Sequence, residues 1–322
     1  MDHDDVCVLL PTLNEAETIG DVIDGFRAEG FDHFLVVDGH STDATREIAA
    51  DHGARVIEQS GKGKGQAVRE GVRHVEREVV LMADGDGTYR PEDATAMLEP
   101  IFAGRANHVI GDRFADMEEG AMTKLNGVGN RLINRAFALI HGRNLRDILS
   151  GYRAFTVESF ERYTLSADGF GIETELAVEC VRHNTPTEVV DITYLARPGG
   201  SETNLNPLTD GGRIILTLYR LAKTNNPLFY FGSVGAVGIV IGLGFGAYVL
   251  YDYLARGISH EAMAVVGTFS ILLGVQLVMF GFLSEIIVAI NREQRREIES
   301  LSKTVEEALE ATGDPDEGTR ED

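Results

Sequence analysis

Two carboxylates that stand one residue apart are the side chains of this sequence with the clearest chemical use. Asp84 and Asp86 lie among glycines, directly after the apolar run Val79-Val80-Leu81. That run predicts a buried strand, so both acids would stand at its carboxyl end, where parallel sheets bind their ligands. The two negative charges repel each other unless a cation lies between them. Oxygen ligands suit Mg²⁺ or Mn²⁺, and the segment therefore predicts a site for a divalent metal and a diphosphate.

The stretch Asp84-Gly85-Asp86-Gly87 is also typical of an ordinary turn, since aspartate and glycine dominate turns. From these residues alone, the turn and the metal site stay open as alternatives. An EF-hand calcium loop is excluded, because a loop starting at Asp84 would need glycine and glutamate where Tyr89 and Thr95 stand.

The elements that would position these acids alternate along the chain. Short apolar runs predict strands, and stretches with helical periodicity follow them. The strands are expected at 6–10, 34–37, 55–57, 79–82, 109–110 and 189–193. The helices are expected at 15–28, from 41 onward, at 66–75 and at 91–103. This alternation predicts an α/β fold with βαβ units and a doubly wound, mostly parallel sheet.

Polar residues follow the first, second and fourth expected strands, where a nucleotide can lie across the strand ends. These are Pro11-Thr-Leu-Asn-Glu15, the segment from Asp38 to Asp43, and the acidic pair. Asp38 suits a ribose hydroxyl or a base edge. The alternative is a helix-capping turn in which Ser41 is the cap.

The loop Ser60–Gly65 contains two lysines among glycines. It lacks the Ser or Thr of a Walker loop, and Gln66 stands where the dinucleotide fingerprint needs its third glycine, so neither class is supported. The loop can still wrap a diphosphate with its backbone amides and with Lys62 or Lys64. A flexible surface loop is the equal alternative.

Composition narrows the classes of protein. The 322 residues include 29 Lys and Arg against 51 Asp and Glu, a net charge of −22, which argues against a nucleic-acid-binding protein. This acidity favours a protein adapted to high salt over an ordinary acidic one. Cys7 and Cys180 form neither a disulfide framework nor a zinc site. The acidic start shows no signal peptide, so the N-terminal part is expected in the cytoplasm.

Two apolar segments, 228–250 and 262–290, are long enough to cross a membrane. Basic residues lie before the first and after the second, whereas the connection between them holds only Arg256. The flanking basic residues are Arg220, Lys223, Arg292, Arg295 and Arg296. They predict a multi-pass protein of the cell membrane with both termini in the cytoplasm.

The sequence divides into four expected parts. Residues 1–209 form a cytoplasmic catalytic domain, 210–226 an amphipathic helix at the membrane interface, and 227–291 the two spans. A core helix of the soluble domain is the alternative for 210–226. Residues 292–322 are expected to be helical at first and then a disordered acidic tail.

Nine motifs in this order resemble family 2 glycosyltransferases with the GT-A fold, and among them dolichyl-phosphate or polyprenyl-phosphate hexose synthases. The motifs are PTLNE at 11–15, VVDGHSTDAT at 36–45, GKGKGQA at 61–67, ADGDGTYRPED at 83–93, IGDR at 110–113, GNRLIN at 129–134, RDILSGYRAF at 146–155, GFGIETEL at 169–176 and ITYLARPGGSETNLNPLTDG at 192–211. More narrowly, the chain resembles the haloarchaeal enzymes of S-layer N-glycosylation that load the first hexose onto dolichol phosphate. The resemblance implies an inverting transfer of a hexose from a nucleotide sugar, with Mg²⁺ or Mn²⁺, and other N-glycosylation enzymes as possible partners.

The resemblance also implies residue roles. Asp84, Asp86 and Thr88 are expected to bind the metal. Donor binding falls to Pro11, Leu13, Glu15, Asp38, Lys64 and Asp84. Acceptor-phosphate binding falls to Arg113, Lys124, Arg131 and Arg197. Asp86, Asp147 and Arg153 are the expected catalytic residues. Asp147 would orient the arginines or act as a base. Glu173 and Glu175 would support the site.

Three departures from the family bear on the donor and the acceptor. Thr88 stands where members that use GDP-mannose often carry Gln, which favours UDP-glucose, with a mannose synthase as the alternative. Lys124 and Gly127-Val128 stand where the family often has an Arg–x–x–x–Ser motif. Some relatives have four membrane spans, whereas this chain has two. Two spans are also too few for the membrane channel that a processive polysaccharide synthase needs. A non-catalytic scaffold that binds a nucleotide sugar at the membrane is the rival from another class.

Overall fold

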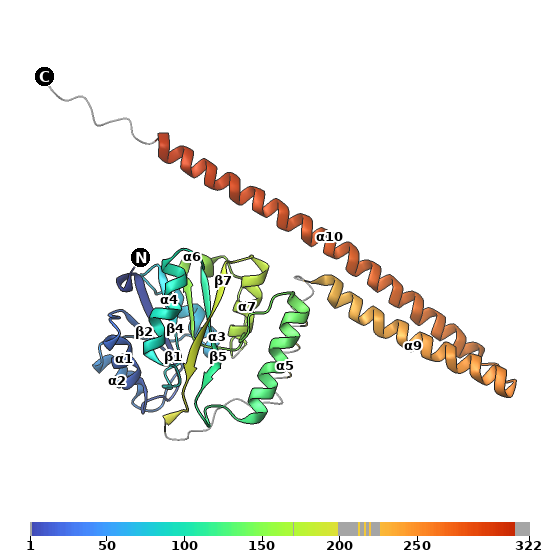
Figure 1. Ribbon diagram of the computed structural model, residues 1–322, viewed down its shortest axis with the longest axis horizontal. Helices are drawn as coiled ribbons and strands as arrows, with labels where there is room; N and C mark the ends of the chain where they lie inside the picture. Colours follow the sequence, from blue (N-terminus) through green and yellow to red (C-terminus); the bar gives the residue numbers. More distant parts are fainter. Residues whose placement is uncertain are drawn as a thin grey trace. The chain divides into compact units, whose positions relative to one another are not determined.

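The structure is a computed structural model that describes residues 2–169, 171–198, 212, 216, 219 and 226–312. The chain forms two compact units, Met1–Tyr219 and Arg220–Asp322. The first contains a seven-stranded sheet in the order β3-β2-β1-β4-β6-β5-β7 (Figure 1). The strands are β1 Val6–Thr12, β2 Phe34–Asp38, β3 Arg55–Glu58, β4 Val79–Met82, β5 His108–Met117, β6 Arg153–Thr156 and β7 Thr187–Tyr194.

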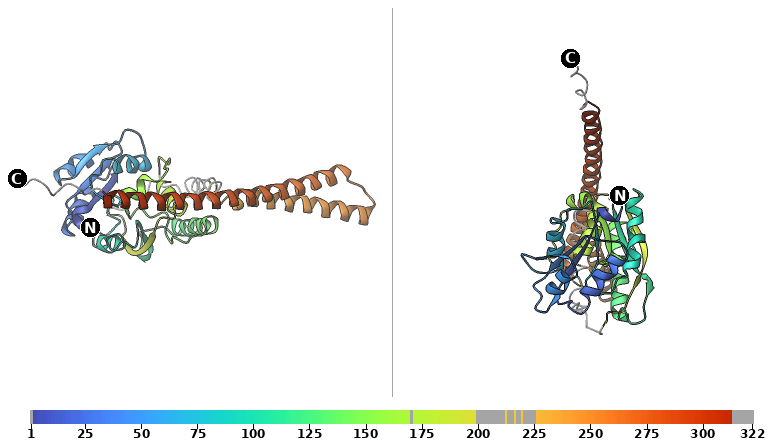
Figure 2. Two further views of the ribbon diagram at one scale, coloured as in Figure 1. Left: turned by 90° about the horizontal axis from the view of Figure 1, so that it is seen from above. Right: turned by 90° about the vertical axis from the view of Figure 1, so that its left-hand side faces the viewer.

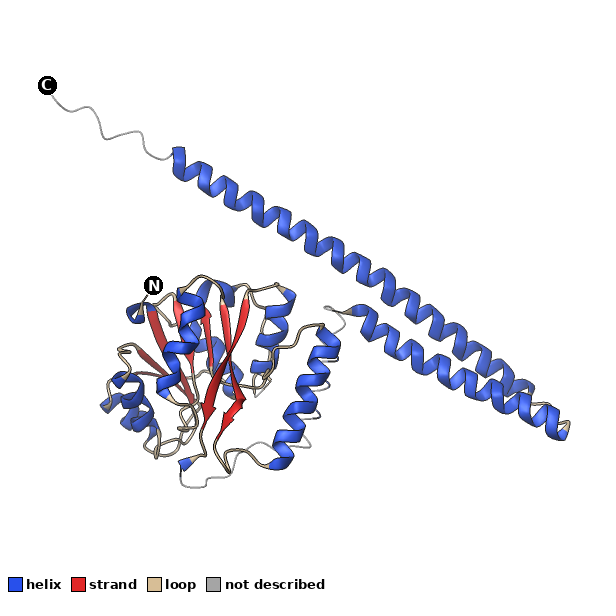
Figure 3. Cartoon of the chain, viewed as in Figure 1, coloured by secondary structure: helices blue, strands red, loops and turns tan. Residues whose placement is uncertain are grey.

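Helices lie beside the strands in the first unit (Figure 3). Side chains along the strands alternate between two apolar cores, as the pleat requires. In β1, Val8 and Leu10 face one core together with α1 (Ile19–Ala28) and α4 (Ala94–Phe102). Cys7 and Leu9 face the other core together with α3 (Lys64–Val72) and α7 (Ile172–Arg182). The helices are η1 His3–Asp5, α1 Ile19–Ala28, α2 Thr45–Asp51, α3 Lys64–Val72, η2 Pro91–Asp93, α4 Ala94–Phe102, α5 Lys124–His141, α6 Val157–Glu161 and α7 Ile172–Arg182.

The sheet is mostly parallel, as predicted, and β4 has the predicted bounds. Strands β1, β2, β3 and β4 are mutually parallel, so the carboxyl ends of β1, β2 and β4 meet at one edge. Thr12 pairs with Asp38 at the ends of β1 and β2, which brings the two polar loops to the same level. Strand β6, which was not expected from the sequence, runs antiparallel to both β4 and β5.

The second unit contains two long helices, α9 Pro227–Arg256 and α10 Glu261–Thr312, which run side by side (Figure 2). Over Pro227–Arg256 and Glu261–Asn291 the mean hydropathy reaches 2.0 and 2.2, so each segment could span a membrane. Glycines permit the close contact: a Cβ atom on Gly235 would lie 2.5 Å from the carbonyl oxygen of Gly274. The expected interfacial helix over 210–226 and the expected tail after Thr312 lie outside the described residues, apart from isolated positions.

Candidate active site

Asp84 follows β4 and lies against a lysine from the glycine-rich loop. Lys64, the first residue of α3, places its Nζ atom 2.5 Å from Asp84 Oδ1 and 2.7 Å from Glu173 Oε1. Burial would lower the pKa of Lys64, but Asp84 and Glu173 outweigh burial and raise it. Burial raises the pKa of Asp84, Lys64 opposes that rise, and the charge of Asp86 adds to it. Lys64 is therefore a cation shared by the partly exposed carboxylate of Asp84 and the buried carboxylate of Glu173.

Asp86 is held by partners on both of its oxygens. Thr88 donates to Oδ1 through its backbone N–H at 3.1 Å and its hydroxyl at 2.7 Å. Arg197, in the segment after β7, donates to Oδ2 from Nε at 3.2 Å and from a terminal nitrogen at 2.5 Å. The Thr88 hydroxyl thus orients Asp86, and its direct contact with a metal stays a prediction.

Glu15 adds a further carboxylate to this cluster. Its Oε1 atom lies 3.8 Å from Arg197. Burial raises the pKa of Glu15 to about 7; Arg197 opposes the rise, and the charges of Asp86 and Asp84 add to it. More negative than positive groups therefore converge at the tip of β4, which favours an additional cation there.

The donor atoms at this tip fit Mg²⁺ or Mn²⁺. Asp84 and Asp86 offer hard oxygen ligands, which these ions prefer. Within the described ranges, no group of three or more His, Cys, Asp or Glu side chains could hold a metal. Mg²⁺ is commonly bound by one or two protein carboxylates together with substrate phosphates. The arrangement therefore suits an ion that binds together with a diphosphate.

The two polar loops after β1 and β2 form one surface. Asn14 has a positive φ of 56°, and its backbone N–H donates to the Ser41 hydroxyl at 2.9 Å. Asp38, which is fully buried, accepts from the Ser41 N–H at 2.8 Å. The prediction that Ser41 caps a helix is wrong, because α2 begins at Thr45 and Ser41 instead joins the loops.

This loop surface continues to the acidic pair. The Thr18 hydroxyl donates to the carbonyl oxygen of Gly85 at 2.7 Å and so ties the start of α1 to the loop after β4. Leu13 is 49% exposed on the surface, whereas Pro11 lies within β1. Hydrogen bonds thus join the loops after β1, β2 and β4, and the binding of a nucleoside at Asp38 stays a prediction.

Arg113 and Asp147 form a buried, two-pronged ion pair. Arg113 Nε lies 2.7 Å from Asp147 Oδ2, and a terminal nitrogen lies 2.9 Å from Oδ1. Burial would lower the pKa of Arg113, but Asp147 outweighs it and raises the pKa. The guanidinium also lies over the ring of Tyr194, at 5.4 Å from the centroid. Asp147 therefore holds this arginine in place, and its role in catalysis stays a prediction.

Tyr89 and Gly151 join this ion pair to the acidic pair, and neither was singled out in the sequence. The Gly151 N–H donates to the Tyr89 hydroxyl at 2.9 Å. A Cβ atom on Gly151 would lie 2.8 Å from Asp84 Oδ2 and 2.9 Å from Lys64 Nζ. The tyrosine ring packs 5.5 Å from that of Tyr194. The close approach of backbone to Asp84 explains why a glycine stands at 151.

The placement of Arg153 is at odds with its predicted catalytic role. The side chain is fully buried, and its donors face the carbonyl oxygens of Ser150, Ile148 and Glu173 and the ring of His108. Burial lowers the pKa of both Arg153 and His108. Arg153 therefore links β6 to the segment before it and to the start of α7, and its donors are already satisfied by groups of the protein.

Comparisons with known proteins decide the family. The family model described as glycosyl transferase family 2 matches residues 7–164. The chain is 62% identical over 299 residues to glycosyltransferase AglJ of Haloferax volcanii, a match that covers 92% of this chain and 98% of that protein. This chain belongs to glycosyl transferase family 2.

Other similarities agree with this family. The chain is 34% identical to the dolichyl-phosphate hexose transferase of Haloferax volcanii, over 66% of this chain and 91% of that protein. The fold is similar to that of glucosyl-3-phosphoglycerate synthase from Mycobacterium tuberculosis, solved in complex with Mn²⁺, UDP-glucose and phosphoglyceric acid. That match has a TM-score of 0.57 and 24% identity, over 67% of this chain and 79% of the other. The chain is thus a GT-A glycosyltransferase of glycan biosynthesis.

Several predicted site residues of this glycosyltransferase lie apart from the acidic pair. Arg131 lies over the ring of Phe114, at 5.5 Å from the centroid, and Lys124 begins α5. Among the described residues, no contact joins either of them to Asp84 or Asp86. Glu175 accepts from the backbone N–H groups of residues 166 and 167, both at 2.8 Å, so it supports a loop.

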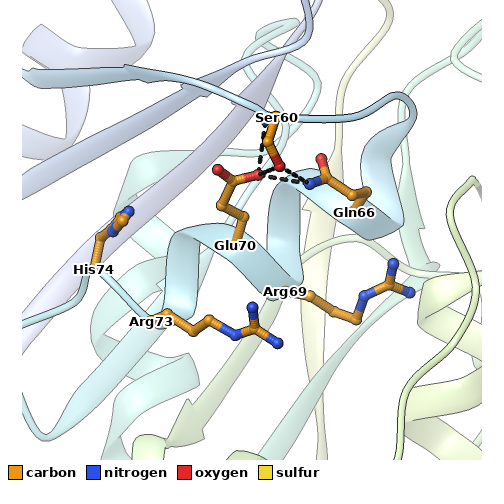
Figure 4. A pocket seen from close by; sticks show the side chains of 6 residues that line it. All are labelled: Ser60, Gln66, Arg69, Glu70, Arg73 and His74. Atoms are coloured by element: carbon orange, nitrogen blue, oxygen red, sulfur yellow. Dashed lines mark hydrogen bonds between the residues drawn. The ribbon is translucent and has the colours of Figure 1, made fainter.

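A surface pocket of about 290 Å³ lies along α3, and neither Asp84 nor Asp86 is among the residues that line it (Figure 4). Within it, Glu70 accepts from the Ser60 hydroxyl at 3.0 Å and from Gln66 Nε2 at 2.6 Å. These contacts fix the beginning of the glycine-rich loop to the helix that follows. The pocket therefore supports the loop that carries Lys64 and holds none of the candidate metal ligands.

Glu15 gives the stability of the protein a pH dependence of defined sign. Its pKa rises from an ordinary value of 4.5 to about 7 on folding, so the folded protein binds the proton more tightly. Its contribution to the free energy of unfolding is complete below about pH 4.5 and is lost as the pH rises through about 7. In chelator, Glu15→Gln is therefore expected to show a smaller fall in melting temperature across this range than the parent. Equal falls in both proteins would contradict the assignment.

Proposed function

We propose that this glycosyltransferase moves a hexose, glucose from UDP-glucose, onto dolichyl or another polyprenyl phosphate at the cytoplasmic face of the membrane. The product would serve protein N-glycosylation. The observation that carries the proposal is the tip of β4, where Asp84 and Asp86 each lie against a cation from another element, Lys64 and Arg197. Such a cluster suits the binding of a diphosphate beside a second anion.

The donor would lie along the surface formed by the loops after β1 and β2. Asp38 would hold the nucleoside, with Leu13 against it, and Lys64 would reach the diphosphate. When bound, Mg²⁺ or Mn²⁺ at Asp84 and Asp86 would offset the charge of the diphosphate. Lys64 and Arg197 supply positive charge to the same place from the protein itself.

The transfer itself forms one bond and breaks one. An oxygen of the acceptor phosphate bonds to the anomeric carbon, and the bond from that carbon to the diphosphate breaks, with the electron pair leaving on the nucleotide. A phosphate monoester has a second pKa of about 6, so the acceptor is largely ionised at neutral pH. The enzyme therefore needs to position an anion more than to remove a proton. Arg113, fixed by Asp147, and Arg197 are suited to this because guanidinium binds phosphate with two parallel hydrogen bonds.

The membrane part has a role in this proposal. Helices α9 and α10 would span the membrane and keep the catalytic unit close to a lipid-borne acceptor, which raises the effective concentration of that acceptor. The similarity to a protein named dolichyl-phosphate hexose transferase supports this acceptor class. The Mn²⁺ and UDP-glucose named for the solved structure support the donor and metal class.

A donor panel tests the proposal. Membranes that contain the full chain are incubated at high salt with dolichyl phosphate, Mg²⁺ or Mn²⁺, and radiolabelled UDP-glucose or GDP-mannose. Label is expected in the lipid fraction with UDP-glucose and is expected to disappear with chelator. Transfer from GDP-mannose alone would show that the transferred sugar is mannose and not glucose. Absence of labelled lipid with every common nucleotide sugar would favour the non-catalytic scaffold.

A further inference from the structure

Arg146, which stands directly before Asp147, has a backbone conformation that arginine rarely adopts. Its φ is 58°, in the left-handed region. The N–H of Asp147 donates to the carbonyl oxygen of Leu145 at 2.7 Å and closes a three-residue turn with Arg146 at its centre. Such a turn is strained for a residue other than glycine, and strain persists only where the surrounding contacts hold it. The contacts of Arg146 must therefore offset this strain.

The guanidinium of Arg146 joins two carboxylates on neighbouring strands. One of its terminal nitrogens lies 2.6 Å from Asp112 Oδ2 in β5 and 2.7 Å from Asp191 Oδ1 in β7. Asp112 and Asp191 are register partners, so their like charges would repel each other without the arginine. The backbone N–H of Arg146 also donates to Asn144 Oδ1 at 3.0 Å. Together these contacts fix the turn against the edge of the sheet.

Two successive residues of β5 pair with two successive residues of this turn. Asp112 pairs with Arg146. Arg113 pairs with Asp147. Because side chains alternate along a strand, the two ion pairs lie on opposite sides of β5. The turn therefore holds the strand from both sides, and its conformation sets the direction from which Asp147 reaches Arg113.

We propose that Arg146 is a positioning residue for the acceptor phosphate, which acts on Arg113 through Asp147. Arg146 fixes the turn, the turn fixes the carboxylate of Asp147, and this carboxylate holds the Arg113 guanidinium at 2.7 and 2.9 Å. The N–H groups of Arg113 that do not face Asp147 are the ones that can bind a phosphate. Guanidinium binds phosphate through two parallel hydrogen bonds, so a rotation of its plane weakens the binding.

This inference rests on the proposed function in one respect, that Arg113 binds the phosphate of the acceptor. It goes further because the sequence predicted no role for Arg146. The ion pairs of Arg146 join β5, β7 and its own turn, whereas the donor is proposed to lie along the loops after β1 and β2. Loss of Arg146 should therefore weaken acceptor binding and leave donor binding unchanged. A residue that only stabilised the fold would affect both alike.

The test measures binding to the full chain in detergent at one fixed, high salt concentration. Isothermal titration calorimetry with Mg²⁺ present gives the dissociation constants of farnesyl phosphate, a short polyprenyl phosphate, and of UDP. Arg146→Gln is expected to raise the dissociation constant of farnesyl phosphate by a factor of about 10 and to leave that of UDP within a factor of about two. Arg105→Gln is the matched control and should change neither. Arg105 is 47% exposed and bridges Glu99 and Glu188 in the same way.

Two further variants show whether Arg146 acts through Arg113. Lysine in Arg113→Lys keeps the charge but has no planar fork for Asp147 to hold. In this background, Arg146→Gln is therefore expected to raise the dissociation constant of farnesyl phosphate by less than about twofold. Asp112→Asn removes the charge that holds Arg146 and leaves the arginine in place, and it is expected to weaken farnesyl phosphate binding selectively as well.

An unchanged dissociation constant of farnesyl phosphate in Arg146→Gln would overturn the inference and leave the proposed function standing. Equal weakening of farnesyl phosphate and UDP in both Arg146→Gln and Asp112→Asn would overturn it in favour of a purely structural role. The full effect of Arg146→Gln in the Arg113→Lys background would show that Arg146 does not act through Arg113. A parent protein that binds UDP and no farnesyl phosphate would refute the proposed acceptor, and the inference with it.

Discussion

Replacement of Asp86 by asparagine is expected to lower the turnover number of hexose transfer by a factor of about 100 to 1,000. The side chain keeps its shape and its contact with Thr88, but it loses the charge that holds Arg197 at 2.5 Å. It also loses a hard oxygen ligand for the metal that binds with the diphosphate. Both losses weaken the stabilisation of the negative charge that develops on the leaving nucleotide during transfer. The measurement is the rate of labelled lipid formation at saturating donor and acceptor.

Asp24→Asn is the matched control for this variant. Asp24 is 54% exposed and pairs with Arg27 on α1, so its loss of charge is expected to leave the turnover number within a factor of about two of the parent. Both variants should insert into membranes in equal amounts. A turnover number for Asp86→Asn as high as that for Asp24→Asn would remove Asp86 from the mechanism.

The strands and loops that carry the site could be predicted from the sequence. A strand buried on both faces reads as a continuous apolar run, which is why β4 was found with its bounds at Val79–Met82. Parallel strands bring their carboxyl ends together, so the grouping of the loops after β1, β2 and β4 followed from element order alone. The sequence offered Lys62 or Lys64 for the diphosphate without choosing between them, and the structure places Lys64 beside Asp84.

The remaining features depend on contacts between distant parts of the chain. Strand β6 pairs antiparallel with β4 and β5. A segment of four residues is too short for its hydrophobic pattern to indicate which strands it pairs with. The sequence predicts Arg153 as a catalytic cation because guanidinium binds phosphate with two hydrogen bonds, whereas here protein carbonyl groups satisfy it in the core. Gly151 stands out only when Asp84 and Lys64 are placed beside it. These are tertiary constraints, which a single sequence does not express.

The same distinction applies to α5. Two of its basic residues, Lys124 and Arg131, stand out in the sequence, and the family resemblance predicts that they bind the acceptor phosphate. The exposure of Leu132 and Leu139 depends instead on which side of the helix the unit buries. An amphipathic pattern alone does not tell which apolar side chains of a helix are buried and which stay exposed.

Asp147→Asn is expected to lower the free energy of unfolding of the catalytic unit by about 3–5 kcal/mol. Asp147 is fully buried, and the substitution leaves the guanidinium of Arg113 without a counter-charge in the interior. The pKa of Arg113 is raised by this carboxylate against the effect of burial, which reflects the same dependence. Denaturant unfolding of the full chain in detergent, followed by a signal from the catalytic unit, measures the loss.

Two further variants test whether the loss of stability comes from the unpaired buried charge of Arg113, and whether Arg113 is needed for hexose transfer. Asp191→Asn removes a 69%-exposed partner of Arg146 and is expected to cost less than about 1 kcal/mol. The double variant Arg113→Met, Asp147→Leu removes both buried charges and is expected to recover most of the lost stability, because paired apolar residues often replace a buried ion pair at little cost. It should nevertheless transfer no hexose, since the guanidinium that positions the acceptor phosphate is gone. Stability that stays low in the double variant would contradict the ion-pair explanation, and transfer at the parent rate would remove Arg113 from acceptor binding.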